Sequence, residues 1–230
     1  MKKLLTILTP LTLMGLVAGV TPAQAAIVAG WNHFNASTAT YPRAADNVGA
    51  NITSTGLNTA GIHRRNTSAD FRLGNVTLNP WNAGSTVNTN QYVEFAVQPG
   101  AGFQVDFTNL QLNARRDSTR LDLVLRSSVD GFTSDLGTQV SLTTSSNTYS
   151  FDLSSLAPQT GPVQFRLYGL NASAGVFFYG ENSANVAGGG FVALHGDITP
   201  TPTVSTPEPS GIVSLIAVGA LGAASLRRRG

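Results

Sequence analysis

The chain has 230 residues, of which 42% are hydrophobic, 11% are charged and none is cysteine. Disulfide frameworks, thiol nucleophiles and thiolate metal sites are therefore excluded. The formal net charge of +2 comes from the two ends, because residues 26–206 hold nine arginines, no lysine and eleven acidic residues. This mildly acidic middle part lacks the basic stripe that nucleic-acid binding requires, and its length suits one domain with its own core.

The first 25 residues have the composition of a secretory signal peptide. Two lysines follow the first methionine, an apolar run covers residues 4–20, and Ala23-Gln24-Ala25 forms a small-x-small site. We therefore predict export, with cleavage between Ala25 and Ala26. The alternative interpretation is an N-terminal membrane helix that is not cleaved.

Apolar and polar residues alternate between turn residues through most of residues 26–198, which predicts strands. Residues 35–69 are expected to form a long irregular connection, although its length indicates short strands within it. About ten strands and no amphipathic helix predict an all-β fold, an antiparallel two-sheet sandwich with Trp31 in its core, and the long connections favour a jelly-roll topology. The predicted strands are residues 27–34, 71–78, 91–98, 103–114, 120–128, 148–153, 163–170, 176–179 and 191–198.

The C-terminal part has three segments after a Pro/Thr linker at residues 199–206, which predicts an extended stalk. A polar motif comes first, an uncharged and mostly apolar run of sixteen residues at 211–226 follows, and a basic end closes the chain. Such a run would rise about 24 Å as a helix, slightly less than a hydrocarbon core of about 30 Å, so we predict a transmembrane segment. The basic end should stay on the cytoplasmic side. The motif is Pro207, Glu208 and Pro209, and the basic end is Arg227, Arg228 and Arg229.

This order of motif, apolar span and arginines over residues 207–230 resembles the PEP-CTERM sorting signal of Gram-negative bacteria. The resemblance implies recognition by an exosortase, a membrane-embedded enzyme similar to cysteine transpeptidases. It also implies cleavage near the motif and release of the outer part to the cell surface or the extracellular matrix. The alternative is an ordinary C-terminal membrane anchor with a proline-rich stalk.

Residues 27–198 also resemble the sandwich domain often found ahead of this sorting signal. The stretches that carry the resemblance are IVAGWNHF, LDLVLRSSVDGF and GPVQFRLYGL. The last strand of such domains usually contains an Arg-x-Asp-Asn element, which residues 191–198 lack. Any ligand or ion role tied to that element is therefore not transferred to this chain.

Sequence motifs for catalysis and metal binding are missing. The chain has no HExxH, no GxSxG elbow and no phosphate-binding loop, and its histidines lack metal-ligand spacing, so we predict no catalytic residue, no metal site and no cofactor. Four aspartates lie close together between residues 117 and 135, so a structural calcium there is an open alternative, although they form no D-x-D-x-D-G array. The histidines, for which we expect surface or strand-edge positions, are His33, His63 and His195.

A glycan-binding surface is the most specific site that the pattern suggests. Arg126 and Arg166 fall on the outward faces of two predicted strands, and Tyr168 follows two residues later. Guanidinium groups beside an aromatic ring suit a sugar or an acidic polysaccharide, and Trp81, in a predicted loop, is a further stacking candidate. The alternative is a cross-strand ion pair between Asp122 and one of the arginines.

Together these features predict an exported, non-enzymatic protein of the cell surface or extracellular matrix. By resemblance, it would cross the inner membrane, be anchored transiently through its C-terminal segment, be processed by an exosortase and associate with exopolysaccharide. The alternative function is a carbohydrate-binding module. A secreted hydrolase is a third, weaker possibility because the sequence offers no catalytic constellation.

Overall fold

The computed structural model describes eight segments, residues 25–31, 42–62, 64–66, 70–73, 81–117, 120–172, 176–179 and 191–202. Most of the predicted signal peptide, the whole predicted sorting signal, His33 and His63 lie outside these segments. Over the described residues, no helix is both long enough and apolar enough to cross a membrane.

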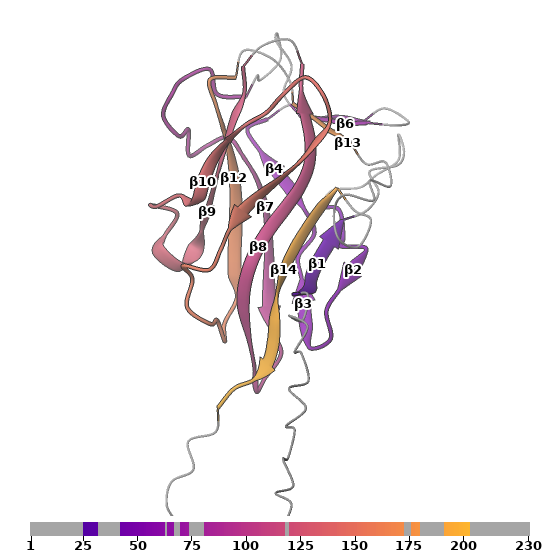
Figure 1. Cartoon of the computed structure of the whole chain (residues 1–230), viewed down its shortest axis with the longest axis vertical. Coiled ribbons are helices and arrows are strands. Elements are labelled where there is room, and N and C mark those ends of the chain that lie inside the picture. The colour runs from indigo at the N-terminus through magenta and orange to yellow at the C-terminus, as the bar shows by residue number, and fades with distance from the viewer. Residues whose placement is uncertain are drawn as a thin grey trace, which may run out of the picture.

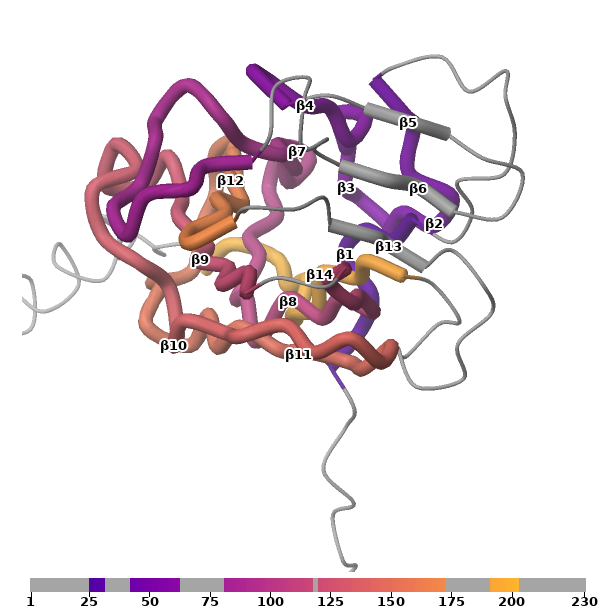
Figure 2. The backbone as a smooth tube through the Cα atoms, turned by 90° about the horizontal axis from the view of Figure 1, so that it is seen from above, coloured from indigo at the N-terminus to yellow at the C-terminus, as the bar shows by residue number. Residues whose placement is uncertain are grey.

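The described strands form two antiparallel sheets that pack face to face (Figures 1 and 2). One sheet has eight strands in the order β2-β1-β14-β8-β13-β6-β5, with β11 also paired to β8. The other has six strands in the order β10-β9-β12-β7-β3, with β4 also paired to β7. The predicted all-β fold with two antiparallel sheets is confirmed. The strands are β1 (Ala26–Trp31), β2 (Asn47–Val48), β3 (Ile52–Ser54), β4 (Asn58–Ala60), β5 (Arg64–Asn66), β6 (Asp70–Leu73), β7 (Tyr92–Pro99), β8 (Phe103–Arg116), β9 (Asp122–Ser127), β10 (Leu136–Ser141), β11 (Asn147–Asp152), β12 (Val163–Leu170), β13 (Val176–Tyr179) and β14 (Val192–Pro200).

Two stretches contain strands that the alternation pattern did not locate. Residues 35–69 hold the four short strands β2 to β5, so the expected irregular connection is wrong where the chain is described, and the indication of hidden strands is confirmed. β10 was missed because its pairing with β9 is irregular between Leu136 and Val140. Gly137 adopts a φ of +66° inside this irregularity, which breaks the period of two.

Aromatic side chains link the two sheets through the core. The ring centroids of Trp31 and Phe95 are 4.8 Å apart, those of Phe95 and Phe165 are 5.5 Å apart, and those of Phe107 and Phe165 are 5.3 Å apart. Trp31 is fully buried, and its indole N–H donates a hydrogen bond to the Arg43 carbonyl over 3.1 Å. The prediction that Trp31 belongs to the core is therefore confirmed, and the core holds both sheets in a fixed relation.

Candidate functional site

Arg126 and Arg166 of the predicted glycan-binding surface lie on the outward face of the six-stranded sheet, and we call this pair the arginine platform. Arg166 on β12 stands directly opposite Arg126 on β9 and Glu94 on β7, so the structure does bring the two arginines together. Each arginine already has an anionic partner, because Arg166 Nε lies 3.4 Å from Glu94 Oε2 and Arg126 Nε lies 2.6 Å from Asp135 Oδ1. The charges on this face are therefore balanced within the chain.

Two aromatic rings hold the Arg166 guanidinium between them. Its central carbon lies 4.2 Å from the ring centroid of Tyr92 and 4.0 Å from that of Phe132. Phe132 reaches this position with a φ of +62°, which is unusual for a bulky residue, and its N–H donates to the Ser127 carbonyl over 2.8 Å. Cation–π contacts of this kind fix the arginine in place.

The two aromatic rings that were candidates for glycan contact are buried. Tyr168 is 1% exposed because Val87 and Tyr92 pack against it. Trp81 is 0% exposed and lies over Gly169, where an added Cβ would come within 2.7 Å of the indole ring. Trp81, the further stacking candidate, is therefore buried, and neither ring can stack on a sugar in this conformation.

Asp122 forms a buried polar network at one end of the same face, which corrects the predicted ion pair with Arg126 or Arg166. Its Oδ2 accepts hydrogen bonds from Arg120 Nε and Asn171 Nδ2, both over 2.8 Å, and its Oδ1 accepts one from Ser141 Oγ over 2.6 Å. Burial acts to raise the pKa of this carboxyl. The hydrogen bonds and the Arg120 charge outweigh burial, so the net pKa lies below its ordinary value.

The outward face of the eight-stranded sheet carries a different set of polar residues. On β8, Leu110, Leu112 and Ala114 point into the core, so the intervening residues point outward. Their register partners on β11 and β14 extend this set across three neighbouring strands. We call this set the polar grid, and its members are Asn109, Gln111, Asn113, Thr148, Ser150, Asp152 and His195.

Five atoms of the polar grid are shielded from solvent and have no hydrogen-bond partner in the structure. Leaving one buried polar atom unpaired costs about 1–3 kcal/mol, so a group of them on one face needs an explanation. Atoms of this kind also occur elsewhere in the described chain, as in the Trp81 indole, the Tyr168 hydroxyl and the hydroxyl of Thr108 beside the grid. The five grid atoms are Asn109 Oδ1, Gln111 Oε1, Asn113 Oδ1, Thr148 Oγ1 and His195 Nε2.

His195 is the grid residue whose predicted environment was wrong. It is 3% exposed, in contrast to the expected surface or strand-edge position. Burial lowers its pKa, and a hydrogen bond to the Ala25 backbone partly offsets this effect, so the pKa stays below its ordinary value. The ring is therefore neutral at pH 7, with one nitrogen bonded to Ala25 and Nε2 left without a partner.

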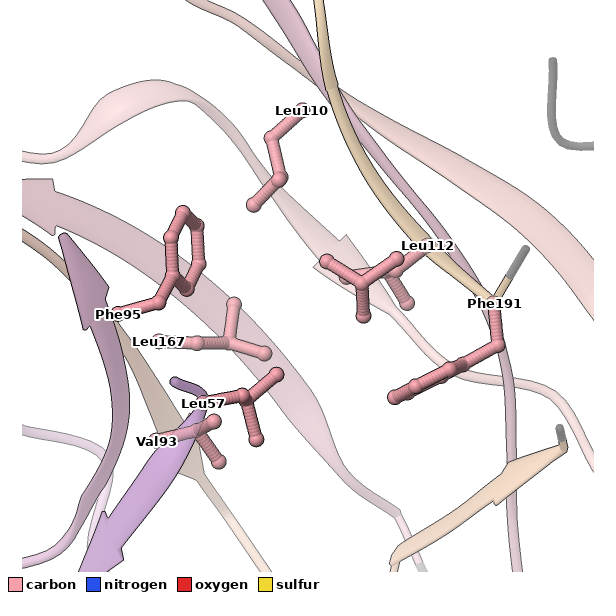
Figure 3. Close-up of a pocket in the computed structure, with 8 residues that line it drawn as sticks. Leu57, Val93, Phe95, Leu110, Leu112, Leu167 and Phe191 are labelled. Atoms are coloured by element: carbon pink, nitrogen blue, oxygen red, sulfur yellow. The ribbon is translucent and has the colours of Figure 1, made fainter. Parts of the chain in front are cut away.

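The small cavity between the sheets has the wrong chemistry for a polar ligand. It measures about 10 Å³, which is close to the volume that a single water needs. Figure 3 shows apolar side chains of both sheets pointing into it, with no polar group among them. In the described segments there is also no group of three or more histidines and carboxylates that could hold a metal ion. The lining residues are Leu57, Val93, Phe95, Leu110, Leu112, Leu167, Phe191 and Val192.

Comparisons with known proteins give a likeness at the level of architecture. No protein-family model matches the chain, and no curated protein matches it. A structure described as "CBM4 structure and function" has 10% identity and a TM-score of 0.33 over 60% of this chain and 79% of that one. A variant of the carbohydrate-binding module CBM29-2 has 9% identity and a TM-score of 0.31 over 81% and 99%. A family two carbohydrate esterase from Cellvibrio japonicus has 10% identity and a TM-score of 0.32 over 66% and 36%. All three TM-scores are below 0.5, and all three identities are at or below 10%.

Proposed function

We propose that this protein is an exported, non-enzymatic β-sandwich that associates with extracellular polysaccharide through the polar grid. The observation that carries this proposal is the group of five shielded, unpartnered polar atoms on one sheet face. Asn109, Gln111 and Thr148 keep part of their surface exposed, so a ligand that reaches them after a rotation of their side chains would remove part of this cost, and a polysaccharide offers hydroxyls in large number. Amide side chains and hydroxyls each provide both a donor and an acceptor, which makes them mutually suited.

The spacing of the grid favours an extended polymer over a compact ligand. Asn109, Gln111 and Asn113 alternate along one strand, so their side chains are about 7 Å apart at a rise of about 3.4 Å per residue. Because the grid includes the carboxylate of Asp152, a neutral glycan fits it better than an acidic one.

The proposed export, membrane anchoring and processing are supported by the sequences of the two ends of the chain. The Ala23-Gln24-Ala25 site supports export, and the motif at residues 207–209, the apolar span and the terminal arginines support membrane anchoring followed by processing by an exosortase. The long connections of the sequence support a jelly-roll arrangement of the sandwich. The resulting location is the cell surface or the extracellular matrix.

The test is retention of the exported protein on neutral polysaccharides in affinity electrophoresis. Gln111→Ala removes one donor and one acceptor from the centre of the grid, so we expect about a five- to tenfold loss of affinity. Gln139→Ala is the matched control, since Gln139 is exposed on β10 and lies outside the grid. Equal retention of the parent and Gln111→Ala would contradict the proposal.

The arginine platform is a second candidate surface because it places Arg126 and Arg166 side by side. It would bind an acidic polysaccharide, for which guanidinium groups are suited. Arg126→Ala should then weaken retention on an anionic polymer and leave retention on a neutral polymer unchanged. The opposite selectivity is expected for Gln111→Ala, so the two faces can be separated by the same assay.

A further inference from the structure

The N-terminal strand begins part-way along its neighbour β14. Ala26, the first residue of β1, is paired with Gly196, whereas β14 continues to Pro200. Beyond Gly196, the only described strand that pairs with β14 is β8 (Figure 1). The predicted cleavage site, between Ala25 and Ala26, therefore coincides with a step in the sheet where β1 starts.

Two carboxylates face each other next to this step. Asp106 on β8 is directly opposite Asp197 on β14, and both residues are exposed. None of the ion pairs among the described residues includes either carboxylate. Like charges directly opposite each other on a sheet are destabilising, so this arrangement lacks a compensating cation.

We infer that the new α-ammonium group of Ala26 supplies this cation when the signal peptide is removed. Hydrolysis of the Ala25–Ala26 peptide bond adds one water, which leaves a carboxylate on the departing Ala25 and an ammonium on Ala26. The ammonium then forms an ion pair with Asp197, which offsets the repulsion between Asp197 and Asp106. Removal of the signal peptide thus adds a positive charge beside two carboxylates that lack one. This inference does not depend on glycan binding.

The register places the ammonium close to Asp197, because β14 is the direct neighbour of β1 and lies between β1 and β8. The nitrogen of Ala26 precedes its Cα, so it lies toward the position opposite Asp197, one residue beyond Gly196. Neighbouring strands are about 4.8 Å apart and consecutive Cα atoms are about 3.8 Å apart, so the group is a few ångström from the Asp197 backbone. Ala26 is exposed, which leaves room for a solvated ammonium.

Cleavage also changes the environment of His195, which pairs with Ile27 across the strands. The Ala25 carbonyl that bonds to the imidazole departs with the signal peptide. An experiment on the N-terminus must therefore separate this lost hydrogen bond from the gained charge. A double-mutant cycle makes this separation. A change at the N-terminus affects the hydrogen bond equally in the parent and in a variant that lacks both carboxylates, so any difference between the two comes from the charge.

The test inserts one glycine between Ala25 and Ala26 in the full precursor. The small-x-small site is kept, so export yields a chain whose ammonium is one residue farther from the carboxylates. We expect the insertion to lower the Tm by about 2 °C more in the parent than in a variant with Asp106→Asn and Asp197→Asn. N-terminal sequencing of the parent should begin at Ala26, and NMR should show that the pKa of its α-amino group lies above the ordinary value of about 7.7.

Two results would overturn the inference. One is an equal effect of the insertion in both backgrounds, which would mean that the carboxylates do not interact with the terminus. The other is a processed parent chain that begins at a residue other than Ala26. A fall of the α-amino pKa in the variant with Asp106→Asn and Asp197→Asn supports the inference, and an unchanged pKa contradicts it.

Discussion

The outward faces of the two sheets differ in where their polar groups find partners. On the six-stranded sheet, Arg126 is paired with Asp135, and Arg166 is paired with Glu94 and stacked between two rings. On the eight-stranded sheet, five atoms of the polar grid are shielded and lack partners. A face that satisfies its own hydrogen bonds stabilises the fold, whereas hydrogen bonds that are left unmade on a shielded face cost stability.

Register and side-chain type explain this difference. In the six-stranded sheet a cation on β12 stands opposite an anion on β7, and long side chains can meet across the strands. In the polar grid, short amide and hydroxyl side chains stand opposite an alanine or one another, as with Gln111 and Ala193 or Asn113 and Thr148. The comparison predicts that mutations on the two faces have opposite effects on stability.

The largest effect is expected for Asp122→Ala, on the outward face of the six-stranded sheet, where the polar groups have partners within the chain. The substitution removes the acceptor of three side chains and should lower the free energy of unfolding by about 2–3 kcal/mol. Urea unfolding measures this change, with Asp117→Ala as the control because Asp117 is exposed. An effect as small as that of the control would mean that the buried network contributes little.

The same network predicts how stability responds to acid. Because the pKa of Asp122 is lower in the folded chain than in the unfolded chain, its contribution is complete above the unfolded value of about 3.9 and is lost as the pH falls through the folded value. Asp122→Asn should remove this part of the pH dependence. Urea unfolding between pH 2 and about pH 6 compares the two slopes, and identical slopes would contradict the assignment.

Gly169→Ala should destabilise the protein by about 1–3 kcal/mol because its Cβ would press into the Trp81 ring. Thermal unfolding and the near-ultraviolet signal of tryptophan would follow the displacement. Gly161→Ala is the matched control, since a Cβ there meets no atom within 4 Å. Equal effects of both substitutions would show that the close packing of Trp81 on β12 is unimportant.

Asn113→Leu should have a smaller effect of the opposite sign. It replaces a buried, unpartnered amide oxygen by an apolar group of similar size, so we expect a gain of about 1 kcal/mol in stability and a loss of glycan retention. Urea unfolding and affinity electrophoresis measure the two changes. A loss of stability would mean that Asn113 serves the fold and not a ligand.

Arg126→Ala is expected to have the smallest effect, below about 1 kcal/mol, because its ion pair with Asp135 is partly solvated. Raising the salt concentration should reduce even this difference. Urea unfolding at low and high salt provides the measurement. A large, salt-independent loss of stability would show that Arg126 contributes more to the free energy of unfolding than a partly solvated ion pair does.

Strong alternation made the main strands predictable. The predicted strand at residues 163–170 has the same bounds as β12, and the one at 103–114 differs from β8 by two residues. In β12, apolar residues at every second position face the core, whereas in β8 the alternation changes phase between Phe107 and Leu110, where the pairing with β14 shifts. Where the period fails, as at Gly137 in β10, the strand could be located only through its partner.

The candidate sites were harder to predict because they depend on contacts between distant segments. Tyr168 is on the expected outward face, but residues such as Val87 cover it, and no pattern in the sequence shows where that segment lies. The alternation Asn109, Gln111, Asn113 is visible in the sequence and is typical of a solvated strand face. The structure is needed to show which residues of the two neighbouring strands stand opposite these amides, and that the amide oxygens lack hydrogen-bond partners.

Binding of polysaccharide through the polar grid can be tested by comparing the outward faces of the two sheets in one experiment. Retention on a panel of neutral polysaccharides would be measured for the exported parent, Gln111→Ala and Arg166→Ala, with folding checked by thermal unfolding. Binding through the polar grid predicts a five- to tenfold loss of affinity for Gln111→Ala and parental affinity for Arg166→Ala, in line with about 1 kcal/mol per lost hydrogen bond. Parental affinity for Gln111→Ala, together with a loss for Arg166→Ala, would contradict it.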